Sequence, residues 1–428
     1  MRCRPRLLAA MIATSLSGLL GTFASVGSYL IDPVRSSCPH WSPSIVVYGT
    51  AAGYGVFGAL SLILAPYVQR LPPRPFVATS LLLTGIVYGS CGATVLACQA
   101  TGPWLQGVFL VAYSLISAAG VFAILPAYDC AMAWLPARTG LSAGLVAVGG
   151  SVGSIPAAQF AIALERLYDR KAIDAGTIFF ACGLVISVMI AIMLILLTHP
   201  WKTDGVVNTK TSPKRKWGVM RFKRLWILLL VRLVTLIPPI GLSSREQDLL
   251  TAFWRESNPP LEFLAFSSQI LDVVGTIFFS IVADSFGPTR LWVIVTGIET
   301  ATIGFLPWFM SRNSSGLWGR YAAVATFSLF NMVKTGPITV LGAISHEFFG
   351  LGSATEALGV LHLSFGVAGL VGPVIMENMY QLSHTFESFL YLSDGFFGSG
   401  LIILALLHSC YEYRSPDKNE AERETAVN

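Results

Sequence analysis

Residues 201–224 read WKTDGVVNTKTSPKRKWGVMRFKR, a polar and basic stretch in a chain that is otherwise strongly apolar. The stretch holds eight of the 28 Lys and Arg residues, together with Pro, Gly and Thr. This composition is typical of a flexible linker at a membrane surface. Six apolar segments precede it and six follow it. We therefore expect a basic cytoplasmic linker at 200–222 between two six-helix halves, 1–199 and 223–411, and a disordered cytoplasmic tail at 412–428.

The composition predicts an integral membrane protein. Of 428 residues, 54% are hydrophobic and only 12% are charged, whereas soluble domains carry about 25% charged residues. Many apolar runs approach the ~20 residues with which a helix crosses a bilayer, and open sheets cannot satisfy their backbone in lipid. We expect an all-α fold of twelve transmembrane helices. The predicted helices span 7–31, 43–68, 75–98, 103–131, 140–164, 176–199, 223–242, 262–283, 290–310, 318–342, 355–377 and 388–410.

The distribution of basic residues predicts the orientation. With both termini and the linker on the cytoplasmic side, the inner segments hold 18 Lys and Arg residues and the outer loops hold 8, which obeys the positive-inside rule. The sequon at Asn313 then falls in an outer loop, where it could be glycosylated. Cys38 and Cys98 would both lie near the outer surface and could pair there. The sequence does not distinguish the plasma membrane from an organelle membrane.

Two rows of small residues predict close helix packing and an internal repeat. Each row lies in the fifth helix of its half, at an offset of 216 residues, which is close to half the chain and is expected of a parallel repeat. Glycines at helical spacing allow close helix approach, although any membrane bundle can use such a motif. The rows consist of Gly150, Gly153 and Pro156, and of Gly366, Gly369, Gly372 and Pro373.

Three further stretches carry a family resemblance. ADSFGPTRLW (283–292) resembles a cytoplasmic loop motif of the major facilitator superfamily, with Asp284, Gly287 and Arg290 at the positions of that motif. WLPARTGLSAGL (134–145) and FGVAGLVGP (365–373) resemble the branch of oxalate:formate antiporters and monocarboxylate transporters. The resemblance covers essentially the full chain. It implies two six-helix halves that rock about a central site, which is secondary transport by alternating access.

The resemblance also implies where a substrate would bind, and the chain departs from it at three positions. Asp272 stands where monocarboxylate transporters have a helix-8 aspartate that takes part in proton coupling, but Thr276 replaces the arginine one turn later. Phe365 replaces the lysine of oxalate-type relatives, and the first helix lacks the lysine of the monocarboxylate group. These missing cations argue against transport of lactate or oxalate by the usual site of the family.

Five ionisable residues inside predicted helices are functional candidates, because a charge in hydrocarbon costs at least ~2.5–3.5 kcal/mol. Asp272 and Arg232 have similar depths and could pair, either as a proton and carboxylate site or as a structural ion pair. Lys334 could meet a substrate carboxylate or extend to the inner interface. His362 could couple to protons or stay neutral in the core. We expect Glu299, in a helix that this fold usually places at the periphery, to be protonated or packed against a neighbour.

Two pairs of charged residues are candidates for a cytoplasmic gate. Asp129 with Arg138, and Asp284 with Arg290, could make contacts that favour one of two conformational states by a small free energy. Polar and aromatic residues of helices 1, 2, 4, 5, 7, 8, 10 and 11 are expected to line the cavity. The candidates are Ser25, Tyr29, Tyr54, Tyr128, Gln159, Gln269 and Asn331.

We interpret the chain as a secondary active transporter of a small polar organic solute, an organic anion or monocarboxylate-like molecule, with protons as a candidate co-substrate. A zwitterion such as an amino acid is the alternative substrate. A transport-inactive membrane sensor or partner protein is the alternative from another class. The sequence has no Walker motif and no nucleophile–base or metal-ligand spacing, so we expect no enzyme, no cofactor, no metal and no nucleic-acid partner. The expected partners are the solute, protons and the lipid bilayer.

Overall fold

The computed structural model describes residues 31–42, 45–98, 104–135, 138–197, 202–203, 206–207, 218–243, 245, 249, 261–312 and 317–413. The first predicted helix lies outside these ranges except for its last residue, and with it Ser25 and Tyr29. Asn313, most of the linker and the tail from residue 414 also lie outside them.

In the first half, α3 to α7 follow the predicted apolar segments, and the short helix α2 lies after the first of them. They are α2 (Ile31–Ser37), α3 (Ile45–Val68), α4 (Pro73–Ala97), α5 (Trp104–Trp134), α6 (Thr139–Asp169) and α7 (Ala175–Leu196). In the predicted linker, two short strands pair antiparallel, β1 (Lys202–Thr203) with β2 (Val206–Val207). A 3-10 turn, η2 (Gly218–Arg221), then leads into the second half.

The second half is also helical, and one predicted helix is divided. Its helices are α8 (Lys223–Ser243), α10 (Leu261–Phe286), α11 (Pro288–Arg312), α12 (Leu317–Val333), α13 (Gly336–Phe349), α14 (Leu351–Ser383) and α15 (Glu387–Tyr413). Across the described ranges, eight helices are long and apolar enough to cross a membrane. The chain is therefore an all-α, multi-pass integral membrane protein.

The prediction of one helix over 318–342 is wrong, because the chain turns at Lys334 and Thr335 between α12 and α13. Pro337 has no N–H to donate to the carbonyl of Val333, so the helical ladder cannot continue through this point. The hydroxyl of Thr335 instead donates to the carbonyl of Met332 at 3.0 Å. A helix interrupted inside an apolar segment results.

Gly275 of α10 allows this interrupted helix to approach closely. A Cβ atom at Gly275 would overlap the backbone carbonyl oxygen of Met332, which cannot swing away as a flexible side chain would. We expect Gly275→Ala to lower the free energy of unfolding by about 1–3 kcal/mol, the usual cost of overpacking. Thermal unfolding of the detergent-solubilised protein measures this. Gly297→Ala in α11, where a Cβ atom has ample space, is the control, and equal melting of the two variants would contradict the prediction.

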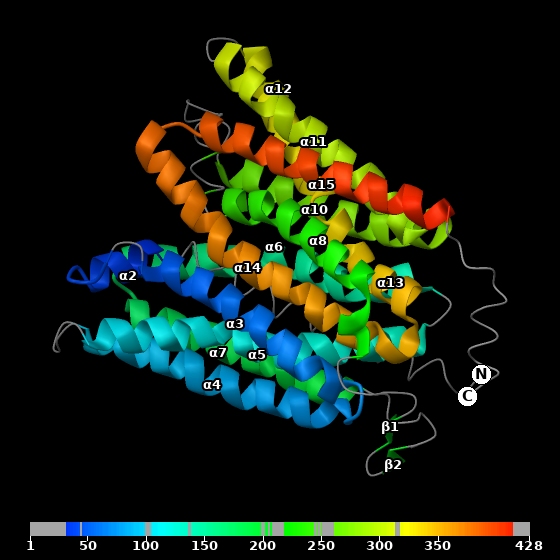
Figure 1. Cartoon of the computed structure of the whole chain (residues 1–428). Helices are drawn as coiled ribbons and strands as arrows, with labels where there is room; N and C mark the ends of the chain where they lie inside the picture. The colour runs from blue at the N-terminus through cyan, green and yellow to red at the C-terminus, as the bar shows by residue number, and fades with distance from the viewer. Residues whose placement is uncertain are drawn as a thin grey trace.

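The two sets of helices meet along two seams. Figure 1 shows the blue-to-cyan helices α3, α4 and α5 on one side and the green-to-red helices α8, α10, α11 and α15 on the other. Helix α14 packs along both α3 and α8, while α6 packs against α10 and α13. Each seam thus joins a helix from before the linker to helices from after it.

A disulfide joins Cys38, just after α2, to Cys98, just after α4. The pairing that the sequence suggested is therefore present. The remaining cysteines with described side chains, Cys91, Cys130 and Cys182, are buried and form no disulfide, which is typical of small core residues.

Candidate functional site

Arg232 is the buried cation around which the candidate site is built. It lies in α8 with only 2% of its surface exposed. The carboxyl group of Glu299 in α11 and the hydroxyl of Tyr128 in α5 lie within electrostatic range of its guanidinium, as does the imidazole of His362 in α14. Residues from both sides of the α3–α14 seam therefore converge on one charge.

The pattern of α8 explains why Arg232 points inward. The helix buries one face at helical spacing, which includes Leu225, Leu228 and Thr235, while Trp226 and Leu230 on the opposite face are exposed. Arg232 lies on the buried face. A guanidinium held there requires a compensating partner, because an unpaired charge in a low-dielectric interior is strongly disfavoured.

Glu299 is the second buried ionisable group of this cluster. It lies on the inward face of α11, with Trp292, Val295, Thr296 and Ile303, and is only 1% exposed. Among the described residues, Arg232 is the charged group that acts on it. Glu299 was expected to be protonated or packed against a neighbour, and the structure adds its electrostatic interaction with Arg232, which its helix alone did not indicate.

The suggested pair of Arg232 with Asp272 is not formed. Within the described ranges, the charged neighbour of Arg232 is Glu299, and Asp272 in α10 is only half-buried. Similar depth along two helices does not fix the direction in which each side chain points around its helix axis. Depth was the only basis for that expectation.

Several buried polar atoms of the site retain unused hydrogen-bonding capacity. Arg232 Nε, Glu299 Oε2 and His362 Nδ1 are buried and have no hydrogen-bond partner among the described residues. Buried polar atoms are satisfied in most proteins, so these three atoms leave hydrogen-bonding capacity that a ligand can use. Arg232 Nε is a donor, and it can bind an acceptor such as a carboxylate oxygen.

A chain of aromatic rings adjoins Arg232 across the α3–α14 seam. The ring of His362 lies 5.3 Å from that of Phe57 and 6.1 Å from that of Tyr128. The ring of Phe365 lies 5.3 Å from that of Tyr54 and 5.6 Å from that of Phe57. Tyr54, Tyr128, Arg232 and His362, four of the predicted substrate-binding residues, are therefore brought together. Phe57 and Phe365 join them, although Phe365 had entered only as a replacement for lysine.

Other predicted binding residues lie elsewhere. Thr276 is fully buried, and its hydroxyl donates to the backbone carbonyl of Asp272 at 2.7 Å, a bond made within the helix. Lys334 is half-buried in the turn between α12 and α13, and Asn331 is buried near the end of α12. Gln159 is exposed on α6. The side chains of Gln269 and Tyr29 are outside the described part of the chain.

Asp284 connects the two halves where α10 ends and α6 begins. Its carboxylate accepts hydrogen bonds from the backbone N–H of Gly140 at 2.7 Å and of Leu141 at 3.1 Å. These are unpaired donors of the first turn of α6, where the helix dipole also favours an anion. Gly287, at a φ of 85°, turns the chain from α10 into α11. The sequence suggested that Asp284 pairs with Arg290. The structure instead gives Asp284 the start of α6 as its partner, and Arg290 is exposed.

Asp129 also contacts the opposite half. Its Oδ1 accepts a hydrogen bond from the hydroxyl of Thr355 in α14 at 3.1 Å. Arg138 is exposed, and no interaction in the described ranges joins it to Asp129, so the suggested contact between these two is absent. A further link, between Arg70 after α3 and Glu356 in α14, was missed because nothing in the sequence relates two charges so far apart.

The second glycine row lies in the seams. Cβ atoms at Gly366 and Gly369 would overlap backbone and side-chain atoms of α3, at Gly58 and Tyr54. A Cβ at Gly372 would lie 2.7 Å from the carbonyl oxygen of Ile237 in α8. Pro373 lies inside α14. The side chains of the first row, Gly150, Gly153 and Pro156, are outside the described part of the chain.

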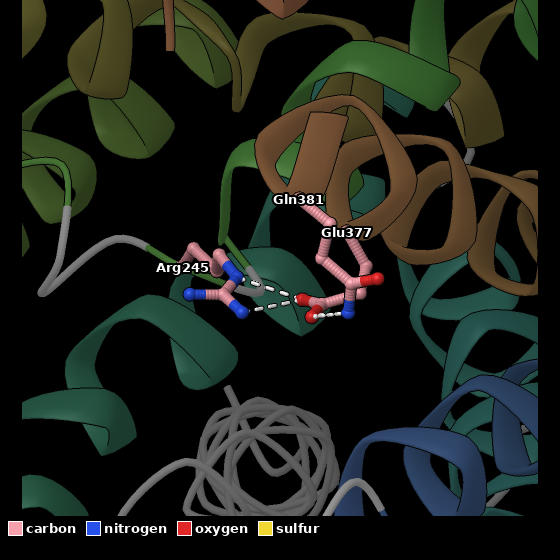
Figure 2. A network of polar contacts seen from close by, with 3 residues as sticks. All are labelled: Arg245, Glu377 and Gln381. Carbon is pink, nitrogen blue, oxygen red and sulfur yellow. Dashed lines mark hydrogen bonds and ion pairs between the residues drawn. The ribbon is translucent and has the colours of Figure 1, made fainter. Parts of the chain in front are cut away.

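A polar network beside these helices was also missed. Figure 2 shows Arg245, just beyond α8, bonded through Nε at 2.8 Å and Nη2 at 2.6 Å to one carboxylate oxygen of Glu377 in α14. Gln381 donates to the other oxygen at 2.7 Å, and the guanidinium lies 4.6 Å from the centre of the Tyr380 ring. The network ties the end of α8 to α14.

Comparison with known proteins identifies the fold. No family model matches the chain. An uncharacterised 38 kDa protein encoded in the 23S RNA operon of Thermoproteus tenax is 23% identical over 370 residues, which are 84% of this chain and 85% of that protein. Because that protein is uncharacterised, its similarity to this chain does not indicate a function.

Three solved structures are similar over nearly the whole chain. One, in an outward-facing state, is a bacterial homologue of the iron transporter ferroportin (14% identity, 93% of this chain and 99% of that one, TM-score 0.64). Another is the human organic anion transporter MFSD10 (12% identity, 94% of this chain and 99% of that one, TM-score 0.65). The third is the major facilitator superfamily transporter FucP in an outward conformation (14% identity, 92% of this chain and 97% of that one, TM-score 0.65). The chain therefore has the fold of the major facilitator transporters.

Proposed function

We propose that this protein is a secondary transporter that carries a small organic anion, a monocarboxylate-like solute, across its membrane by alternating access. The observation that carries the proposal is the buried guanidinium of Arg232, whose Nε lacks a hydrogen-bond partner among the described residues. Arginine presents a planar fork of donors that matches a carboxylate. The fold, shared with transport proteins, supports the proposal but does not specify the solute.

The position of the site supports a transport cycle. Arg232 and His362 belong to helices after the linker, while Tyr128 and the Phe57 ring belong to helices before it. A solute held between these groups makes different contacts when the halves rock, and only such differential contacts can shift a conformational equilibrium. In this proposal Asp284, bound to the start of α6, holds the cytoplasmic ends together.

The proposed orientation places both termini in the cytoplasm. The basic linker supports this placement. In the same orientation the Cys38–Cys98 disulfide, which follows α2 and α4, lies on the outer side of the membrane. Disulfides persist on the oxidising side of a membrane, so the disulfide supports the same orientation as the charge distribution.

A zwitterion such as an amino acid is the second candidate. It is favoured by the electrostatic interaction of Glu299 with Arg232, because a carboxyl group and a guanidinium together can meet an amine and a carboxylate. Glu299 is less exposed than the aromatic rings, so a solute reaches it less easily. For this reason we prefer the anion.

Uptake into reconstituted vesicles tests the proposal. The probes are labelled acetate, lactate, benzoate, alanine and glycerol. We expect saturable uptake of at least one carboxylate that unlabelled carboxylates reduce, with no uptake of glycerol. Preferred uptake of alanine would favour the zwitterion. Protein-free vesicles are the control, and a protein that carries none of the anions would contradict the proposal and favour a sensor or partner role.

A further inference from the structure

We propose that the site prefers a flat aromatic monocarboxylate, whose carboxylate binds Arg232 and whose ring lies among aromatic side chains of the α3–α14 seam. The inference rests on the proposed function and deepens it, because it names the body of the solute as well as its charge. The side chains concerned, here called the aromatic cluster, are Tyr54 and Phe57 of α3 and His362 and Phe365 of α14.

Close contact between two glycines creates the aromatic cluster. A Cβ atom at Gly58 of α3 would lie 2.8 Å from the Cα atom of Gly366 in α14, which is closer than a side chain tolerates. Phe57 and Phe365 directly precede these two glycines, and their ring centres are 5.6 Å apart. The glycines that allow the helices to touch therefore also bring together aromatic rings from before and after the linker.

The inward face of α8 places the aromatic cluster next to Arg232. Leu236 lies one helical turn beyond Arg232 on the same buried face. Tyr54 and Phe365 pack against the apolar group that contains Leu236. Leu233, the sequence neighbour of Arg232, packs against the same group. Arg232 and the rings are thus separated by about 6 Å along the axis of α8, which a solute with a carboxylate close to an aromatic ring can span.

The rings of the aromatic cluster still have flat faces to offer. The planes of neighbouring rings are inclined to each other by 50°, 57° and 72°, so none of these three contacts is a parallel stack. Tyr54, Phe57 and Phe365 are only half-buried. Arg232, in contrast, is 2% exposed. A solute that enters the seam therefore meets the rings before it reaches the guanidinium.

The two parts of the site match two parts of one molecule. Arginine binds a carboxylate through its planar fork of donors. A ring of the solute gains offset-stacked or edge-to-face contacts with aromatic side chains, and each contact strengthens binding about two- to tenfold. An aliphatic acid such as acetate or lactate gains the first interaction but not the second. The arrangement therefore selects for an aromatic ring on the carboxylate.

Uptake into reconstituted vesicles tests the preference with labelled benzoate, cyclohexanecarboxylate and acetate. The first two acids have the same number of carbon atoms, but only benzoate has an aromatic face. We expect the KM of benzoate to be about two- to tenfold lower than that of cyclohexanecarboxylate, and the KM of acetate to be the highest. Equal KM values for benzoate and cyclohexanecarboxylate, or a preference for acetate, overturn the inference.

Phe57→Leu and Phe365→Leu each remove one ring and keep an apolar side chain. Each variant is expected to raise the KM of benzoate about two- to tenfold and to leave the KM of acetate unchanged. Phe309→Leu in α11 is the matched control, because Phe309 is also a half-buried ring but packs against Trp308, with ring centres 4.9 Å apart. It is expected to change neither value. An unchanged benzoate KM in both Phe57→Leu and Phe365→Leu contradicts the inference.

Thermal unfolding of the detergent-solubilised protein provides a readout that needs no transport. A ligand that binds the folded state raises Tm, and at equal concentration the tighter ligand raises it more. We expect a larger rise with benzoate than with cyclohexanecarboxylate in the wild type, and equal rises in the double variant Phe57→Leu with Phe365→Leu. Equal rises in the wild type overturn the inference alone. Absence of both uptake and a Tm shift with all three acids overturns the proposed function, and the inference with it.

Discussion

Arg232→Gln is expected to abolish carboxylate uptake and to lower the free energy of unfolding, because it removes a buried charge that interacts electrostatically with Glu299. Uptake fails because glutamine offers no charge to the incoming anion. Stability falls because Glu299, buried at 1% exposure, is left without its counter-charge. Vesicle uptake and thermal unfolding in detergent measure the two effects separately.

The double variant Arg232→Gln with Glu299→Gln separates function from folding. It removes both charges, so most of the lost stability is expected to return while uptake stays absent. Lys223→Gln, an exposed cation at the start of the same helix, is the control and is expected to change neither property. Normal uptake by the well-folded double variant would show that Arg232 is not the anion site.

Asp284→Asn is expected to shift the protein away from the state in which the end of α10 is held against the start of α6. The variant replaces two charge-assisted hydrogen bonds, to the N–H groups of Gly140 and Leu141, with weaker neutral contacts. Each hydrogen bond to a charged group contributes about 1.5–3 kcal/mol, so even partial loss changes the population ratio by about tenfold or more.

Spin labels at the start of α6 and the end of α10 measure this shift as a longer mean distance between the two helices. Ser285→Ala, the exposed neighbour of Asp284, controls for changes in the turn itself. A distance distribution identical to that of the wild type would mean that Asp284 only caps α6 and does not bias the conformational equilibrium.

Hydrophobicity was sufficient to predict most of the fold. The apolar runs predict the described helices because each must span the same thickness of hydrocarbon. The exception is the turn at Lys334 and Thr335: Pro337 lies within a continuous apolar run, and hydrophobicity does not register a missing N–H. The Cys38–Cys98 pairing was suggested by topology alone and is present.

The site was predictable only in part. Arg232, Tyr128 and His362 were recognisable as polar residues in apolar helices, and the structure brings them together. The partner of Arg232 was not recognisable, because depth along a helix leaves the direction of the side chain undetermined and Glu299 lies in a helix expected at the periphery. Asp284 was singled out by its loop motif, but its partners are backbone N–H groups, which have no side-chain signature in the sequence.

The central claim is that Arg232 binds the carboxylate group of the transported solute. Its most direct test is uptake by wild-type vesicles of a labelled acid and of its amide, benzoate and benzamide or acetate and acetamide, at equal concentration. The two molecules have nearly the same shape, so charge is the main difference between them. We predict saturable uptake of the acid, no saturable uptake of the amide, and neither in Arg232→Gln. Equal uptake of acid and amide, or uptake of the acid that survives Arg232→Gln, would contradict the claim.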